Sequence, residues 1–242
     1  MMVLHDSGER VVPEWVRPTD KMGSMLLEQH RRRYGIASAD VRGKKVLDLG
    51  CGAGYGAHLL AEAGAAEVTA VDIDSAALSY AAETYAHPVV EYIQQDATEF
   101  APAAQDYDLV TCFEVLEHVG DPAELLRVIR SALKPDGLLM ISGCVYPTRD
   151  FYRFHLRDYS KLSFRDELAA GGFVVLDQLD QVAVMSAAEV RGTIRRHWRS
   201  FPLERFRTNP VKVLRAIVST QLINGVTHEE AMFTCAVKPD SG

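Results

Sequence analysis

Short apolar runs alternate with amphipathic segments through the middle of the chain. Apolar residues recur at helical spacing at 57–64, 75–86 and 121–133. Five runs are rich in Val, Ile, Leu and Phe and are predicted as strands: 44–49, 67–72, 89–96, 107–113 and 137–143. Such an alternation is typical of a parallel sheet with helices on both faces. Asp121 followed by Pro122, and Asp74 or Ser75, are predicted helix caps.

The pattern changes after Gly143. A strand is predicted at 173–180 and another at 230–237, whereas residues 183–228 do not follow the alternation. We therefore predict one domain over residues 1–242, a Rossmann-like, doubly wound, seven-stranded sheet whose last strand is antiparallel. Its core covers about 40–182 and 229–238. The N-terminal segment 1–39, with helical spacing from Lys21 to Ala37, and the helical insertion 183–228 are predicted to form a lid.

Composition narrows the class of protein. The chain has 242 residues, 48% hydrophobic and 24% charged, and a net charge of −7. This composition predicts a soluble protein, and the acidic surface argues against nucleic acid as a partner. No apolar run approaches the roughly 20 residues that cross a bilayer, so no membrane partner is expected. The four cysteines contain no CxxC pair and predict a disulfide-free, cytoplasmic protein: Cys51, Cys112, Cys144 and Cys235.

The segment from Val46 to Gly54, VLDLGCGAG, is the densest chemical signal. A strand, a glycine-rich turn and a helix follow one another, and ligands bind at the carboxyl ends of such strands. Asp72 ends the second strand, where a carboxylate accepts hydrogen bonds from a ribose diol. Gly52, Gly54 and Ala57 also satisfy a dinucleotide fingerprint, but Asp48 would crowd a pyrophosphate. A phosphate-binding P-loop is excluded because no Gly-Lys-Ser/Thr follows the glycines.

Five segments in order resemble the motifs of class I S-adenosylmethionine-dependent methyltransferases: 47–54, 71–72, 95–97, 107–110 and 133–137. The resemblance covers roughly residues 40 to 180 and implies S-adenosylmethionine as cofactor. Asp48, Gly50 and Gly52 would face its methionine part, and Cys51 between them is predicted to bind the cofactor as well. Other roles that the resemblance implies are ribose binding by Asp72, adenine contacts by Ile73, Asp96 and Ala97, and a border to the methionine by Phe113. A looser N-terminal resemblance to bacterial glycan and secondary-metabolite methyltransferases places Tyr34 over the cofactor.

Glu114, Glu117 and His118 follow the fourth strand. In a helical turn they would share one face, and the two carboxylates would need a positive partner such as Mg²⁺. The run resembles ubiquinone-pathway O-methyltransferases and small-RNA 2′-O-methyltransferases, which hold a divalent ion there. His155 matches the further histidine of the RNA enzymes. We predict Glu117, His118 and His155 as catalytic residues, and all four as a Mg²⁺ site. Without metal, His118 or His155 would serve as general base.

Residues 191–215 carry eight basic side chains and a single acid, Glu204. Arginine binds carboxylates and phosphates bidentately, so Arg195 and Arg199 are predicted to bind an anionic acceptor. A solvated helix face or a contact in a homo-oligomer is the alternative interpretation.

These observations favour O-methylation of a small molecule, such as a sugar or a natural product of secondary metabolism, including antibiotic biosynthesis. Methylation of an RNA 3′ end is a second hypothesis, although aromatic residues do not interleave the arginines. N-methylation of a small molecule is a third. The non-enzymatic hypothesis is a cofactor-binding partner subunit.

Overall fold

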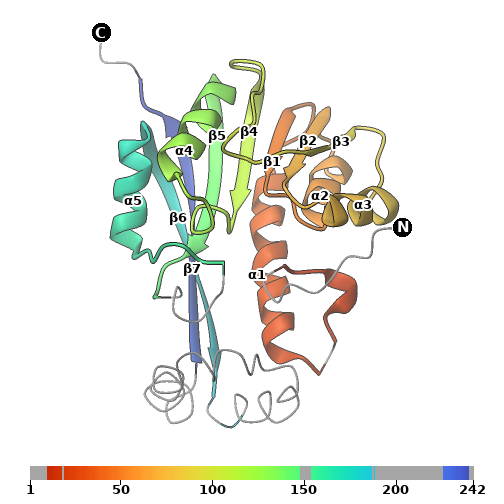
Figure 1. Ribbon diagram of the computed structural model, residues 1–242, viewed down its shortest axis with the longest axis vertical. Helices are drawn as coiled ribbons and strands as arrows, with labels where there is room; N and C mark the ends of the chain where they lie inside the picture. Colours follow the sequence, from red (N-terminus) through yellow and green to blue (C-terminus); the bar gives the residue numbers. More distant parts are fainter. Residues whose placement is uncertain (1–9, 18, 148–153, 187, 189–225, 240–242) are drawn as a thin grey trace.

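A computed structural model describes residues 10–17, 19–147, 154–186, 188 and 226–239. These residues build one seven-stranded sheet in the order β3-β2-β1-β4-β5-β7-β6 (Figure 1). The strands are β1 (Lys45–Leu49), β2 (Glu67–Asp72), β3 (Val90–Gln94), β4 (Tyr107–Phe113), β5 (Leu133–Cys144), β6 (Phe173–Met185) and β7 (Val226–Val237). Only β7 runs against its neighbours, pairing antiparallel with both β5 and β6. The predicted mixed sheet is confirmed.

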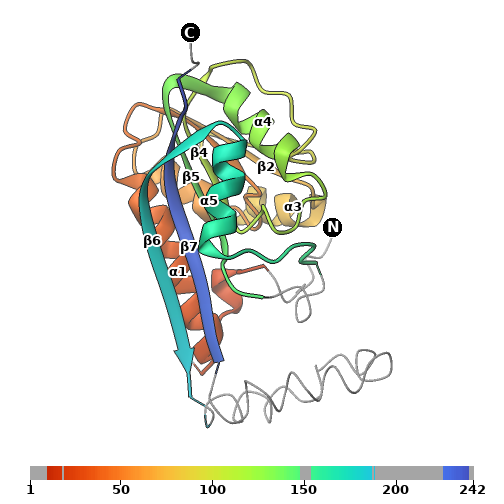
Figure 2. The same cartoon turned by 90° about the vertical axis from the view of Figure 1, so that its left-hand side faces the viewer.

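Helices cover both faces of the sheet. They are α1 (Lys21–Ser38), α2 (Tyr55–Glu62), α3 (Ser75–Thr84), α4 (Pro122–Ala132) and α5 (Lys161–Ala170), preceded by a 3₁₀ turn, η1 (Pro13–Trp15). On one face α4 and α5 bury Leu125, Ile129 and Phe164 against the strands. On the other, α1 and α2 bury Tyr34 and Leu60. Figure 2 shows α4 and α5 together on one side of the strands. The alternation of inward side chains along each strand produces these two apolar layers.

Local sequence signals set the helix ends. Asp74 caps α3 by accepting from the amides of Ala76 and Ala77, and Asp121 caps α4 by accepting from the amide of Glu124. Both caps are as predicted. The helix α2 begins at Tyr55, two residues before the predicted start, because the chain enters it directly from Gly54 at φ 85°.

The last two strands are longer than predicted. β6 continues to Met185 and β7 begins at Val226, so residues 183–185 and 226–228 belong to the sheet and not to the predicted lid. Polar residues interrupt the apolar pattern there, among them Gln181, His228 and Glu230, which are nonetheless buried. Their partners come from distant elements, which the pattern along the chain does not reveal.

Candidate active site

A cavity of about 530 Å³ opens at the carboxyl ends of β1, β2 and β4. The structure gathers nearly all of the predicted cofactor residues around it: Tyr34, Gly50, Cys51, Gly52, Asp72, Ile73, Asp96, Ala97 and Phe113. Glu114 and His118 line the same cavity, whereas Asp48, Glu117 and His155 are not part of its wall. One cavity therefore joins the glycine turn to part of the Glu-x-x-Glu-His segment.

The glycine turn is shaped by close packing. Gly50 has φ 75°, and a Cβ atom there would lie 2.3 Å from Cγ2 of Val115. Gly54 has φ 85°, and a Cβ atom there would lie 2.4 Å from the Cβ of Ala81. Positive φ and lack of space both require glycine. The backbone of the turn is thereby exposed to a ligand in the cavity.

Asp72 and Ile73 form the next part of the wall. The Asp72 carboxylate accepts hydrogen bonds from the amides of Gly52, at 2.8 Å, and Asp74, at 2.9 Å. Each oxygen keeps a lone pair for a diol. Ile73 is 65% exposed, which leaves an apolar side chain uncovered beside the cavity. These residues fit the ribose and adenine of S-adenosylmethionine.

Asp96 is held in place by its own turn. Its Oδ1 accepts hydrogen bonds from the amide of Thr98, at 2.8 Å, and from the Thr98 hydroxyl, at 2.7 Å. The carboxylate lies on the cavity wall next to Ala97. Its second oxygen can therefore accept from an exocyclic amine such as that of adenine.

Asp48 does not occupy the predicted place facing the methionine, because it lies beneath the cavity. Its buried carboxylate accepts hydrogen bonds from the Tyr34 hydroxyl, at 3.1 and 3.2 Å, and from the Thr111 hydroxyl, at 2.7 Å. Burial raises the pKa of Asp48 to about 6, although these hydrogen bonds oppose the shift. Asp48 thus positions Tyr34, which itself lines the cavity.

The N-terminal segment, which was predicted to form part of a lid, contributes two residues to the cavity wall that were not predicted individually. Arg10 and Val11 contribute to the wall, and Arg10 forms an ion pair with Asp74 at 3.0 Å. Val12 is buried against the glycine turn and α3. Glu14 accepts hydrogen bonds from the hydroxyls of Tyr80 and Tyr85. The apolar pair of residues 11 and 12 in a polar segment was the available signal.

The Glu-x-x-Glu-His segment is a series of turns and not the predicted helical turn. The amide of Glu114 donates to the Ser142 carbonyl, and Glu114 adopts φ 55° as the chain leaves β4. The i, i+3, i+4 spacing of a helix therefore does not apply. Glu114 reaches the cavity, while Glu117, 1% exposed, accepts from the amide of Cys144 at 3.2 Å. Burial raises the pKa of both glutamates.

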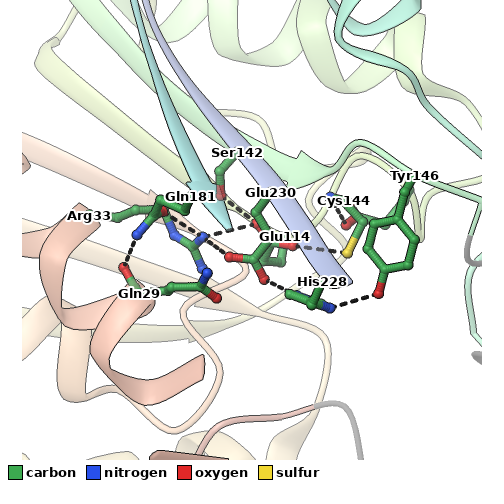
Figure 3. A network of polar contacts seen from close by, with 10 residues as sticks. Gln29, Arg33, Glu114, Ser142, Cys144, Tyr146, Gln181, His228 and Glu230 are labelled. Atoms are coloured by element: carbon green, nitrogen blue, oxygen red, sulfur yellow. Dashed lines mark hydrogen bonds and ion pairs between the residues drawn. The ribbon is translucent and has the colours of Figure 1, made fainter. Parts of the chain in front are cut away.

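The positive charge beside these carboxylates is Arg33, which is fully buried (Figure 3). Its Nη1 donates to Glu230 and to Gln181, and lies 3.5 Å from Oε1 of Glu114. Glu114 also accepts from the Ser142 hydroxyl at 2.7 Å. The guanidinium thus takes the electrostatic role that the sequence analysis gave to Mg²⁺.

The predicted Mg²⁺ ligands do not come together as one group. Among the described residues, two sets of potential ligand atoms lie within 4.8 Å of one another: Glu117, Cys144 and His155, and Cys144, His228 and Glu230. Both include a thiol, whereas Mg²⁺ takes oxygen ligands. These two sets of ligand atoms therefore do not fit Mg²⁺.

His118 is oriented by the backbone. Its Nδ1 lies 3.1 Å from the carbonyl oxygen of Phe154, which can only accept a hydrogen bond, so Nδ1 carries the hydrogen. The neutral ring then has its acceptor at Nε2. The ring of His155 packs edge-on at 4.6 Å, and burial lowers the pKa of His155 to about 4. The His155 imidazole is therefore expected to be neutral at neutral pH.

Arg195 and Arg199 lie outside the described residues, as does the rest of the basic segment 191–215. No helix within the described part of the chain is long and apolar enough to cross a membrane.

Comparison with known proteins defines the class. Residues 26–181, more than half of the chain, match the model of the methyltransferase domain family. The chain belongs to this family. The match and the fold confirm the predicted class, an S-adenosylmethionine-dependent methyltransferase domain.

Among individual proteins, the chain is 36% identical over 152 residues to a ubiquinone biosynthesis O-methyltransferase of Neisseria meningitidis. The match covers 57% of this chain and 62% of that protein, so the chain spans less than two thirds of the relative's length. Among solved structures, YcgJ of Bacillus subtilis is similar with a TM-score of 0.68 and 18% identity, over 88% of this chain and all of that one.

A phosphoethanolamine N-methyltransferase of Haemonchus contortus, in complex with S-adenosyl-L-methionine, has a TM-score of 0.61 and 24% identity. The match covers 88% of this chain and 53% of that one. At this identity the likeness shows the fold and not the substrate.

Proposed function

We propose that this chain transfers the methyl group of S-adenosylmethionine to a hydroxyl group of a small molecule, with His118 as general base. The observation that carries the proposal is the shared cavity, in which His118 lies with the glycine turn, Asp72 and Phe113. A base within reach of the cofactor can remove the hydroxyl proton as the new bond forms.

S-adenosylmethionine supplies an electrophilic methyl group when it is bound. Asp72 would bind the ribose, Ile73 would cover the adenine, and Asp96 would accept from its amine. Tyr34 and Phe113 pack edge-to-face with centroids 5.0 Å apart and would enclose the methionine end. The chain's contribution to the rate is then mainly the positioning of the acceptor oxygen and the exclusion of water.

His118 would take the acceptor's proton on Nε2. The Phe154 carbonyl would stabilise the resulting imidazolium, because it accepts the hydrogen bond from Nδ1. His155 would be a positioning residue whose ring fixes that of His118, and Glu117 would hold the loop through the Cys144 amide. Neither of these two residues needs to touch the acceptor.

The relatives named as ubiquinone biosynthesis O-methyltransferases support a hydroxyl acceptor over an amine. Their names do not point to secondary metabolism or antibiotic biosynthesis. An anionic acceptor held by Arg195 and Arg199, and a cytoplasmic location, stay predictions. All four cysteines are unpaired thiols, as a reducing compartment would keep them.

The first test is cofactor binding by calorimetry. Asp72→Ala should weaken S-adenosylmethionine binding by roughly tenfold or more, since a lost buried acceptor costs about 1–3 kcal/mol. Asp40→Ala, at an exposed carboxylate paired with Lys44, is the control and should bind normally. Equal binding by both variants would contradict the assigned cofactor site.

The second test is a screen of phenols, sugars, amines and RNA 3′ ends with methyl-labelled cofactor. With the acceptor found, His118→Gln should lower kcat by roughly 10²- to 10⁴-fold. His87→Gln is the control. Added Mg²⁺ should have no effect on turnover. Labelling of amines or RNA alone, or no turnover without another protein, would favour the alternative functions.

A further inference from the structure

A second polar cluster lies between the paired ends of β5 and β7 (Figure 3). Cys144 is the cross-strand neighbour of Glu230, and His228 lies two residues before Glu230 on the same face of β7. Cys144 and His228 are 5% exposed and Glu230 is 2% exposed. One sulfur, one ring nitrogen and one carboxylate oxygen lie within 4.8 Å of one another.

The neighbours of this cluster hold its other polar atoms. The Nδ1 of His228 lies 2.7 Å from the Tyr146 hydroxyl, while Nε2 lies 2.6 Å from Oε1 of Glu230. Oε2 of Glu230 accepts from Arg33. Nε2 and Oε1 therefore share one hydrogen bond beside the sulfur of Cys144, whose thiol donates to Oε2 of Glu114 at 3.6 Å. A histidine whose far nitrogen is fixed by a hydrogen bond is typical of metal ligands.

Buried polar groups surround the sulfur of Cys144. Besides the contact of its thiol with Glu114, the amide of Cys144 donates to Oε1 of Glu117 at 3.2 Å. Glu230 is paired with the fully buried Arg33. A thiolate at Cys144 would be costly beside these carboxyl groups unless a cation paired with it. A divalent cation bound at the sulfur would supply that pairing.

We propose that Cys144 Sγ, His228 Nε2 and Glu230 Oε1 bind a divalent transition-metal ion of the zinc type. A thiolate and an imidazole favour zinc over Mg²⁺. On binding, the Cys144 thiol loses its proton to solvent, and the His228 ring carries its proton on Nδ1, facing Tyr146. For this donor set, the ligand atoms of a tetrahedral zinc site lie roughly 3.3–3.6 Å apart, from the known bond lengths. Nε2 and Oε1, now 2.6 Å apart in a hydrogen bond, would move apart to admit the ion.

The set of Glu117, Cys144 and His155 competes for the same sulfur. His155 lies outside helices and strands, whereas all three residues of the proposed site stand on paired strands. Ligands on rigid elements need less ordering when the ion binds. The β5–β7 set is therefore the favoured one. It does not depend on the proposed methyl transfer.

The test uses the untagged full chain with Zn²⁺ or Co²⁺ and no S-adenosylmethionine. Elemental analysis after dialysis should find one zinc per chain, and Co²⁺ should give a thiolate-to-cobalt charge-transfer band. Cys144→Ser should abolish the band. The matched control is Cys235→Ser, a buried thiol elsewhere on β7 that should leave the band unchanged. Circular dichroism would show that each variant is folded.

Three further variants keep the test decisive if Cys144→Ser does not fold. Tyr146→Phe should weaken zinc binding by roughly 10- to 100-fold, because it removes the hydrogen bond that orients His228. His228→Gln should abolish stoichiometric binding, and His155→Gln should leave it unchanged. Absence of bound metal in the wild type, a band that survives Cys144→Ser, or loss of metal with His155→Gln alone would overturn the proposal. Because no cofactor is present, failure of the proposed methyl transfer would not affect these results.

Discussion

Tyr34 connects the N-terminal helix to the glycine turn through a single hydroxyl group. It donates to the buried Asp48 carboxylate, and its ring packs against Phe113 and Tyr55. Asp48 has one other described donor, Thr111. Asp48 therefore influences the cavity through Tyr34. Removing the single hydroxyl oxygen of Tyr34 tests this contact.

Tyr34→Phe removes that oxygen and keeps the ring. The free energy of unfolding should fall by about 1–3 kcal/mol, because the Asp48 carboxylate stays buried with one donor fewer. Affinity for S-adenosylmethionine should fall as well. Urea denaturation and calorimetry measure the two effects. Tyr80→Phe, whose hydroxyl donates to Glu14 at an exposed position, should change stability by less than about 0.5 kcal/mol. Similar losses in both variants would contradict the role given to Tyr34.

At the scale of elements, α1 contacts both the helix α2 and the strands β6 and β7. Tyr34 reaches α2, where it lies on Gly56, and Arg33 reaches Glu230 on β7 and Gln181 on β6. A Cβ atom on Gly56 would lie 2.0 Å from Cζ of Tyr34. The contact between α1 and α2 thus depends on a residue without a side chain.

Gly56→Ala should destabilise the protein by about 3 kcal/mol, since the tyrosine ring must move in a packed core. Gly35→Ala is the matched control, because a Cβ atom there meets no atom within 4 Å. This second change lies in the last turn of α1 and should stabilise the helix by up to about 0.5–1 kcal/mol. Thermal and urea unfolding of the two variants should therefore differ in sign. Equal stability would show that α1 adjusts to the extra methyl group.

At the scale of the whole molecule, the half-buried His30 ties stability to pH. Burial lowers the pKa of His30 to about 3, and the charge of Arg33 adds to the effect. The unfolded chain, with a pKa of about 6.5, therefore binds the proton more readily than the folded chain. The stabilisation is complete above pH 6.5 and is lost as pH falls towards 3. Asp48, whose pKa is raised, acts in the opposite direction.

His30→Gln isolates this contribution from those of the carboxylates. Between pH 6.5 and pH 5.0, the wild type should lose about 1–2 kcal/mol more stability than the variant. Urea denaturation at the two pH values measures the difference. His87→Gln, at a histidine near the exposed Glu62, should follow the wild type. A His30→Gln variant with the same pH dependence as the wild type would show that His30 is protonated in the folded state.

Local sequence patterns were sufficient to predict much of the fold of this protein. The strand runs, the caps Asp74 and Asp121 and the glycine turn are each encoded within a few neighbouring residues. The carboxyl ends of parallel strands meet at one edge of the sheet. The sequence alone therefore predicted that Asp72, Asp96 and Phe113 lie near one another, as they do around the cavity. The order of the strands along the chain was enough to predict this arrangement, because parallel strands are joined by right-handed connections and few topologies satisfy that rule.

Only the tertiary structure determines which polar residues are buried and which partners they contact. Arg33 and Glu230 are 197 residues apart, and neither carries a sign of burial in its own neighbourhood. Glu114 leaves the helical spacing because its amide bonds to Ser142 on another strand. Burial of a charge depends on a partner brought in by the fold, whereas burial of an apolar residue follows from its own chemistry. The hydrophobic pattern of the sequence is therefore sufficient to predict the sheet. Which polar groups share the site depends on contacts between residues far apart in the sequence.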